Sequence, residues 1–182
     1  MPTVTESGIT LNFPDENFFR FENCQGHKNL QNIQEMDCCW YDQNNDILYL
    51  IELKGWNSDK LNEEIDPNFD KQEIDKIKAG RKKGHIDSLV KKSVDSLFMF
   101  ISILLGKPYA KQIQACSPFT ISNNTTIKLF TIMDWKETDT TYVSVINDSY
   151  RDKFKSYAKL LNIKTYLVMT KTQAQKQFVW VS

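Results

Sequence analysis

The chain has 182 residues, a formal net charge of zero, 41% hydrophobic and 25% charged residues. This composition is typical of one soluble globular domain, residues 1–182, with a core of useful size. Its longest apolar run, residues 97–105, is about half the length that spans a bilayer, which excludes a membrane-spanning helix there. Global charge neither predicts nor excludes a polyanionic partner, so nucleic-acid binding would require a local basic patch.

The N-terminal sequence lacks the basic and apolar regions of a secretory signal. Four cysteines are few for a disulfide scaffold; they are Cys24, Cys38, Cys39 and Cys116. Neighbouring residues of a strand point to opposite faces, so Cys38 and Cys39 are not expected to pair with each other. We therefore expect an intracellular protein with reduced cysteines and no membrane partner.

The first half of the chain predicts three strands. The first dozen residues are polar and are expected to be loosely held. A short strand is predicted over 18–24, followed by a polar turn region over 25–32. Two further strands, 36–41 and 47–54, flank an Asn/Asp-rich connection of the kind that hairpins favour.

The charged segment 57–84 follows, and Pro67 within it predicts a mobile loop with at most a short helix around 71–79. Apolar residues then recur at helical spacing up to Leu105, which predicts a helix capped by Asp87 or Ser88. Gly106 and Pro108 are expected to stop this helix.

The last third predicts a strand over 127–133, an amphipathic helix over 149–161 and a strand over 165–169. An edge strand is predicted over 176–181. Strands that give way to alternating helix and strand indicate an α/β domain, with a mixed central sheet covered by helices on both faces.

The second strand of the hairpin is apolar but ends in charged residues. Side chains alternate along a strand, so Glu52 and Lys54 project from the same side, with Leu53 anchored behind them. If the chain turns at Asn44 and Asn45, Asp37 lies opposite the end that carries Glu52 and Lys54. Two carboxylates and an ammonium group would then converge at one end of the sheet.

This pattern resembles the PD-(D/E)XK nuclease superfamily: Asp37, fourteen intervening residues, then Glu52-Leu53-Lys54 at the end of an apolar strand. The resemblance implies a restriction-endonuclease-like fold with an αβββαβ-type core. It also implies an Mg²⁺- or Mn²⁺-dependent endonuclease that hydrolyses DNA or RNA phosphodiester bonds. Met36 stands where the family has its name-giving proline, and no helix is evident before the hairpin.

Carried over from the family, Asp37, Glu52 and Lys54 are the expected catalytic residues. Asp37 and Glu52 would hold the metal, and the carbonyl of Leu53 would be a further ligand. The acidic residue that many members take from an upstream helix would be Glu22 or, less favoured, Glu16. A polar residue early in the following helix would be Lys91 or Lys92.

Nucleic-acid phosphates would be contacted by the basic residues that follow the acidic stretch. These residues are Lys78, Arg81, Lys82, Lys83 and Lys91. Trp56, directly after the lysine motif, is the aromatic residue best placed to stack on a base. A homodimer or a larger complex is a further expectation of the resemblance.

Other interpretations stay open. Glu-x-Lys at a strand end is commonly a solvated rim pair, although this strand is apolar on both faces and should desolvate Glu52. Cys24, His27, Cys38 and Cys39 could ligate zinc, yet buried free cysteines are commoner. A catalytically inactive module that binds nucleic acid or a protein through residues 59–83 is the alternative function. A carboxylate-pair glycosidase is a third possibility, which Lys54 disfavours.

Overall fold

The structure is a computed structural model of the 182-residue chain, and it describes residues 1–56, 70–135 and 140–182. The elements, in chain order, are β1 (Thr3–Glu6), β2 (Ile9–Asn12), β3 (Phe18–Phe19), the 3-10 turn η1 (Phe21–Asn23), α1 (Gln25–Lys28), β4 (Cys38–Asp42), β5 (Ile47–Lys54), α3 (Lys71–Leu104), α4 (Ala110–Gln114), β6 (Thr126–Met133), α5 (Thr141–Leu160), β7 (Thr165–Thr170) and α6 (Lys171–Gln177).

A mixed sheet organises the chain, as predicted, and it contains five strands. The strand order is β3-β4-β5-β6-β7, with β3, β4 and β5 antiparallel and with β5, β6 and β7 parallel. Lys54 of β5 lies beside Met133 of β6. The carboxyl ends of these two parallel strands therefore meet at one edge of the sheet.

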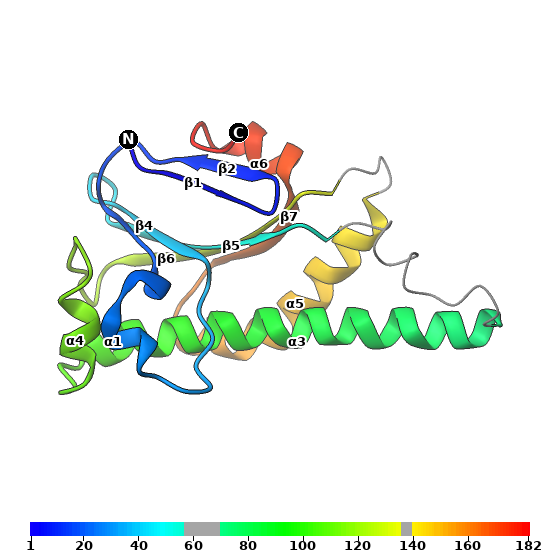
Figure 1. Cartoon of the computed structure of the whole chain (residues 1–182), viewed down its shortest axis with the longest axis horizontal. Helices are drawn as coiled ribbons and strands as arrows, with labels where there is room; N and C mark the ends of the chain where they lie inside the picture. The colour runs from blue at the N-terminus through cyan, green and yellow to red at the C-terminus, as the bar shows by residue number, and fades with distance from the viewer. Residues whose placement is uncertain (57–69, 136–139) are drawn as a thin grey trace.

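The two faces of the sheet are covered differently (Figure 1). α3 and α5 pack on one face, over Leu48 and Leu50 of β5. The opposite face is covered by the β1–β2 hairpin and the short helix α6, over Tyr49, Ile51 and Leu53. The prediction of helices on both faces was therefore incomplete, because a β-hairpin supplies much of the second layer.

The β4–β5 hairpin forms as predicted. Asp42 pairs with Ile47, and Asp42 Oδ1 accepts hydrogen bonds of 3.1 Å from the backbone amides of Asn44 and Asn45. The loop ends at Asp46, whose φ of 51° lies in the left-handed region that Asp and Asn tolerate. This turn fixes the register of the two strands and hence which residues of β4 lie opposite the end of β5.

Helix α3 is much longer than predicted. It begins with a capping box, in which Asp70 Oδ1 accepts from the Glu73 amide and Glu73 Oε2 accepts from the Asp70 amide. The loop predicted over 57–84 was therefore wrong from residue 70 onward, while 57–69 lies outside the described residues. Asp87 and Ser88 are inside the helix. Its end at Leu104, before Gly106 (φ 62°), is close to the prediction.

The N-terminal prediction was also wrong. Residues 1–12 are not loose: they form the β1–β2 hairpin, in which Val4, Ile9 and Leu11 are buried. No helix precedes β3, since residues 1–17 are described throughout and contain only these two strands. The predicted strand over 18–24 is confined to Phe18–Phe19, and a short helix α1 lies within the predicted turn region.

The C-terminal elements differ in their limits. Strands β6 and β7 match their predictions, and α5 starts eight residues before the predicted helix. No strand forms over 176–181. A second capping box, between Thr170 and Gln173, starts α6, and Val181 makes only an isolated bridge to Leu11.

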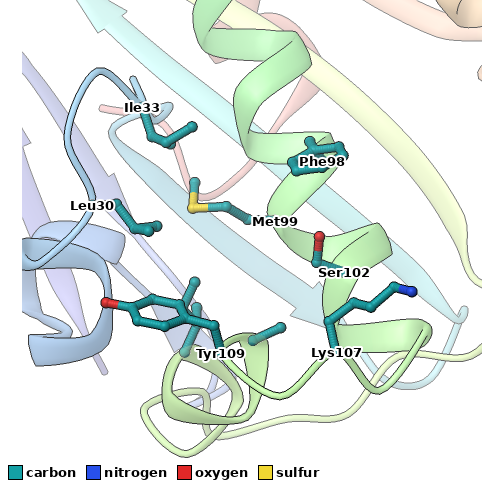
Figure 2. Close-up of a pocket in the computed structure, with 9 residues that line it drawn as sticks. Leu30, Ile33, Phe98, Met99, Ser102, Lys107 and Tyr109 are labelled. Carbon is teal, nitrogen blue, oxygen red and sulfur yellow. The ribbon is translucent and has the colours of Figure 1, made fainter.

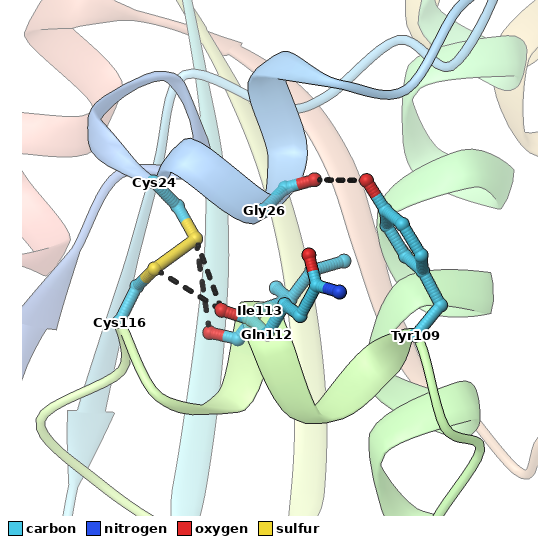
Figure 3. Close-up of a disulfide and its surroundings, with 6 residues drawn as sticks. All are labelled: Cys24, Gly26, Tyr109, Gln112, Ile113 and Cys116. Carbon is cyan, nitrogen blue, oxygen red and sulfur yellow. Dashed lines mark hydrogen bonds between the residues drawn. A yellow bond between two sulfur atoms is a disulfide. The ribbon is translucent and has the colours of Figure 1, made fainter.

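Cys24 and Cys116, 92 residues apart in sequence, form a disulfide that joins the start of α1 to the end of α4 (Figure 3). The prediction that all four cysteines are reduced was wrong for this pair. Helices α1 and α4 pack closely next to this disulfide, because a Cβ on Gly26 would lie only 2.9 Å from the backbone carbon of Gln112. Tyr109 Oη also donates a 3.0 Å hydrogen bond to the Gly26 carbonyl. Cys38 and Cys39 are buried free thiols on opposite faces, as predicted.

A search of the described residues finds no helix with the length and apolar content needed to cross a membrane.

Candidate functional site

Asp37, Glu52 and Lys54 meet at the edge of the sheet where β5 ends. The Asp37 amide donates to Glu52 Oε2 at 3.2 Å, and Asp37 Oδ2 accepts from the Leu53 amide at 2.6 Å. Lys54 Nζ lies 2.5 Å from Glu52 Oε1. The predicted convergence of two carboxylates and one ammonium group is therefore present, and hydrogen bonds from the backbone fix both carboxylates.

The segment before Asp37 is held against α3 by three hydrogen bonds. Lys91 Nζ donates to the Asn32 carbonyl at 2.8 Å, and the Gln34 amide donates to Asp95 Oδ2 at 2.9 Å. The amide of Met36 donates to Ser96 Oγ at 2.9 Å. These contacts fix the position of the chain relative to α3 just before β4 and thereby position Asp37.

Glu52 is a fully buried carboxylate, with 0% of its side chain exposed. Burial and the negative charge of Asp37 raise its pKa, while the nearby Lys54 and Lys92 act in the opposite direction. Oε1 receives two close ammonium groups, but neither approach has the direction of a hydrogen bond. Two cationic side chains therefore face this buried oxygen.

Lys92 is the fourth charged member of the site. Its Nζ lies 2.7 Å from Glu52 Oε1 and 3.3 Å from Asp37 Oδ1, so it bridges the two carboxylates. Burial alone would lower the pKa of Lys92, but the charges of Glu52 and Asp37 outweigh burial and raise it. Lys92 therefore stays protonated here and, together with Lys54, balances the charge of the two carboxylates.

The sequence left Lys91 and Lys92 as alternatives, and the structure separates them. Lys91 is exposed and pairs with Asp95 at 2.5 Å, one helical turn away. It also anchors the segment before β4, which is a structural role. Lys92 alone of the two reaches the carboxylates.

The structure gives Glu22 a different partner. Its carboxylate lies in η1 and contacts Arg20 Nη2 at 2.9 Å, and the same nitrogen contacts Glu6. Arg20 Nε donates to the Asp37 carbonyl at 3.1 Å, so Glu22 is connected to the site only through this arginine. Within the described ranges, no three His, Cys, Asp or Glu residues group in a way that could hold a metal. Glu22 does not complete such a group with Asp37 and Glu52.

Leu53 supports the site through its backbone. Its side chain is buried on the face away from Glu52, and its carbonyl lies 3.5 Å from Ser7 Oγ in the β1–β2 turn. That turn fits closely, since a Cβ on Gly8 (φ 77°) would lie 2.5 Å from Asp134 Oδ2. Asp134, a carboxylate that directly follows β6, thus packs against the hairpin turn.

The donor set at Asp37 and Glu52 fits a hard divalent cation. Both side chains offer carboxylate oxygens, and these oxygens already converge on one cationic group, the ammonium of Lys92. Mg²⁺ is commonly held by one or two carboxylates and keeps several waters, so a third acidic side chain is not required. Asp37, Glu52 and the Leu53 carbonyl are the residues that would hold the ion.

An aromatic pair adjoins Lys54. The rings of Trp56 and His85 stack with centroids 3.9 Å apart and planes inclined by 9°, and Lys54 Nζ lies 6.0 Å from the Trp56 centroid. His85 Nδ1 lies 3.2 Å from Tyr142 Oη. Burial, followed by repulsion from Lys54 and Arg81, lowers the pKa of His85. The sequence singled out Trp56 but gave no signal for His85, which is distant in the chain.

The zinc site considered from the sequence does not form. Cys24 is in the disulfide, and the buried thiols of Cys38 and Cys39 lie on opposite faces of the sheet. His27 Nε2 instead lies 3.1 Å from Glu35 Oε2.

An apolar cavity of about 240 Å³ lies apart from the charged site (Figure 2). Met99 of α3 lies between Leu30 and Ile33 on one side and Phe98 on the other, and Tyr109 also lines the cavity. The cavity contains none of the carboxylates, so it does not contribute to the chemistry at Glu52.

Comparison with protein-family models, with curated proteins and with solved structures gave no match to this chain.

Proposed function

We propose that the chain is a nuclease of the PD-(D/E)XK type, which hydrolyses phosphodiester bonds of DNA or RNA with Mg²⁺ or Mn²⁺. The observation that carries the proposal is the convergence of Asp37, Glu52 and Lys54 at the end of a buried strand. An ion pair that served only solubility would lie in solvent, whereas Glu52 is fully buried and has to be compensated by cations.

The topology supports the proposal. Three antiparallel strands, β3 to β5, are followed by α3 and then by β6, which is parallel to β5. This is the order expected of the strands and the crossover helix in a restriction-endonuclease-like core. The helix expected before these strands is replaced by the β1–β2 hairpin.

The roles follow from the charges. Asp37 and Glu52 would hold the divalent ion, which when bound supplies an activated water and charge neutralisation at the phosphate. Lys54 would place its ammonium beside the phosphoryl oxygens and stabilise the charge that develops on them. Lys92 bridges the two carboxylates in the metal-free protein and would have to release at least one of them when the ion binds.

A non-catalytic module with the same fold is the second candidate, and Lys92 favours it. Because Lys92 and Lys54 already balance the two carboxylates, the site is neutral without a metal. Such a module would bind nucleic acid or a protein without cleaving it. Metal binding separates the two candidates, since a catalytic site has to exchange Lys92 for a divalent ion.

The test is cleavage of single- and double-stranded DNA and RNA with Mg²⁺ or Mn²⁺, together with Mn²⁺ binding measured by calorimetry. We expect Glu52→Gln, Asp37→Asn and Lys54→Met each to lower cleavage by about a hundredfold or more. Glu22→Gln and Asp134→Asn are matched acidic controls and should retain activity. Folded wild-type protein that binds no Mn²⁺ and cleaves none of these substrates would overturn the proposal. Binding of nucleic acid with neither Mn²⁺ binding nor cleavage would favour the non-catalytic module.

A further inference from the structure

The N-terminal half of α3 is a surface to which the proposed chemistry gives no role. These turns extend past the end of the sheet (Figure 1). Ile86 is the first buried residue among the described side chains of α3. A Cβ on Gly80 or Gly84 would meet no atom within 4 Å. A helix gains most of its stability from packing, yet Lys71, Lys76 and Lys78 are exposed in these turns and available to a partner.

The charge of this segment indicates the kind of partner. Residues 71–83 contain six basic and two acidic residues, a formal charge of +4 in a chain with no net charge. The basic residues are Lys71, Lys76, Lys78, Arg81, Lys82 and Lys83. Such a local concentration of positive charge is complementary to a polyanion.

The basic side chains are distributed unevenly around the helix. Lys78, His85 and Lys92 are seven residues apart, which places them on one face of α3. Arg81 and Lys82 lie within one turn of His85 on the same side. Lys76 and Lys83 lie on the opposite side.

The shared face leads to the carboxylates. Lys92 contacts Glu52 and Asp37. His85, seven residues earlier in the helix, stacks on Trp56. With a rise of 1.5 Å per residue, Lys78 lies roughly 21 Å from Lys92 along the helix axis. One face of α3 therefore leads from a row of cations, past a partly exposed aromatic pair, to the proposed metal ligands.

The recess of the site favours a flexible strand. The side-chain exposures of Glu52 and Asp37 are 0% and 11%, and those of Lys92 and Lys54 are 20% and 21%. A single strand can bend its backbone toward such groups, whereas a stiff duplex beside the projecting helix is held away from them. Trp56 offers a ring on which an unpaired base can stack.

We infer that a single-stranded nucleic acid follows the face of α3 that carries Lys78, Arg81 and Lys82, stacks a base on the Trp56–His85 pair, and presents its backbone to Glu52 and Asp37. This inference rests on the proposed function for the last step only. Lys83 and Lys91 lie on other faces of α3 and are not part of this path.

The test is fluorescence anisotropy with a short labelled single strand and the corresponding duplex, measured in EDTA so that cleavage cannot occur. Wild-type protein should bind the single strand more tightly. Lys78→Ala should weaken binding about threefold to fivefold and reduce the slope of log K against log salt by about 0.7. Lys76→Ala removes the same charge two residues away on the opposite face and should change affinity less than about twofold. Trp56→Ala should weaken binding about tenfold, and Trp56→Phe less.

Equal weakening by Lys78→Ala and Lys76→Ala would overturn the path, as would preference for the duplex or no binding at all. Far-UV circular dichroism of each variant checks that α3 is intact. Because binding is read without metal, this outcome is independent of the nuclease proposal. Tight binding along this face without cleavage would support the binding path and contradict the nuclease proposal. Metal-dependent cleavage, with equal nucleic-acid affinity of the Lys78→Ala and Lys76→Ala variants, would support the nuclease proposal and contradict the binding path.

Discussion

The Nζ atom of Lys92 on α3 lies 2.7 Å from Oε1 of Glu52 on β5, and this contact joins the helical layer to the one fully buried acidic side chain among the described residues. The two residues are 40 positions apart in sequence. Their contact makes Lys92 both a structural counter-ion and the group that a divalent ion would displace.

Replacing Lys92 by methionine keeps the aliphatic stem and removes the charge. Glu52 and Asp37 would then share Lys54, and we expect the free energy of unfolding to fall by about 3 kcal/mol because a buried charge loses its partner. Urea unfolding at neutral pH measures this loss. Lys91→Met, which breaks the exposed pair with Asp95, should cost about 1 kcal/mol or less. Equal stability of the two variants would show that Lys92 does not compensate Glu52. Mn²⁺ should restore more stability to Lys92→Met than to the wild-type protein.

The raised pKa of Glu52 sets the sign of a pH effect on stability. The folded chain binds this proton more tightly than the unfolded chain, whose ordinary value is 4.5. Wild-type stability should therefore fall, relative to Glu52→Gln, as pH rises from 4.5 through the raised pKa. Lys92, whose pKa is raised, stays protonated over this range and contributes a constant difference. Urea unfolding of both proteins from about pH 4 to about pH 8 measures the trend. A difference that is independent of pH would contradict the burial of an ionisable Glu52.

His85 should titrate below its ordinary value of 6.5, because burial and the charges of Lys54 and Arg81 disfavour its protonated form. Its contribution to stability is present above pH 6.5 and is lost as pH falls through the lowered pKa. Proton NMR of the imidazole, assigned with His85→Gln, gives the value directly. Lys54→Met should raise it toward 6.5. A pKa of His85 above 6.5, or a pKa that is the same in the wild-type protein and in Lys54→Met, would contradict the arrangement.

The disulfide between Cys24 and Cys116 should stabilise the contact of α1 with α4. Cys116 is exposed, so Cys116→Ser breaks the bond without burying a hydroxyl. We expect the free energy of unfolding to fall by about 2–4 kcal/mol, because a long loop of the unfolded chain is released. Dithiothreitol should reduce wild-type stability to the same level and leave the variant unchanged. A variant as stable as the oxidised wild-type protein would argue against the bond.

Local patterns predicted the part of the fold that depends on neighbouring residues. The Asn/Asp turn and the alternation along β5 placed Asp37 beside Glu52 and put Leu53 on the other face, as the structure has them. The same reasoning failed for the first turns of α3. Charged residues dominate there and no apolar stripe marks the helix, and none of the described side chains of α3 before Ile86 is buried.

The sequence by itself therefore determined the mixed sheet, the hairpin and the three charged residues at its end. Only the tertiary structure decided that Lys92 rather than Lys91 joins them, that Glu22 is held by Arg20, and that His85 stacks on Trp56. Strand alternation and turn geometry act over a few residues and leave a readable period in the sequence. Contacts between α3 and the strand ends join residues tens of positions apart, and their geometry depends on how whole elements pack.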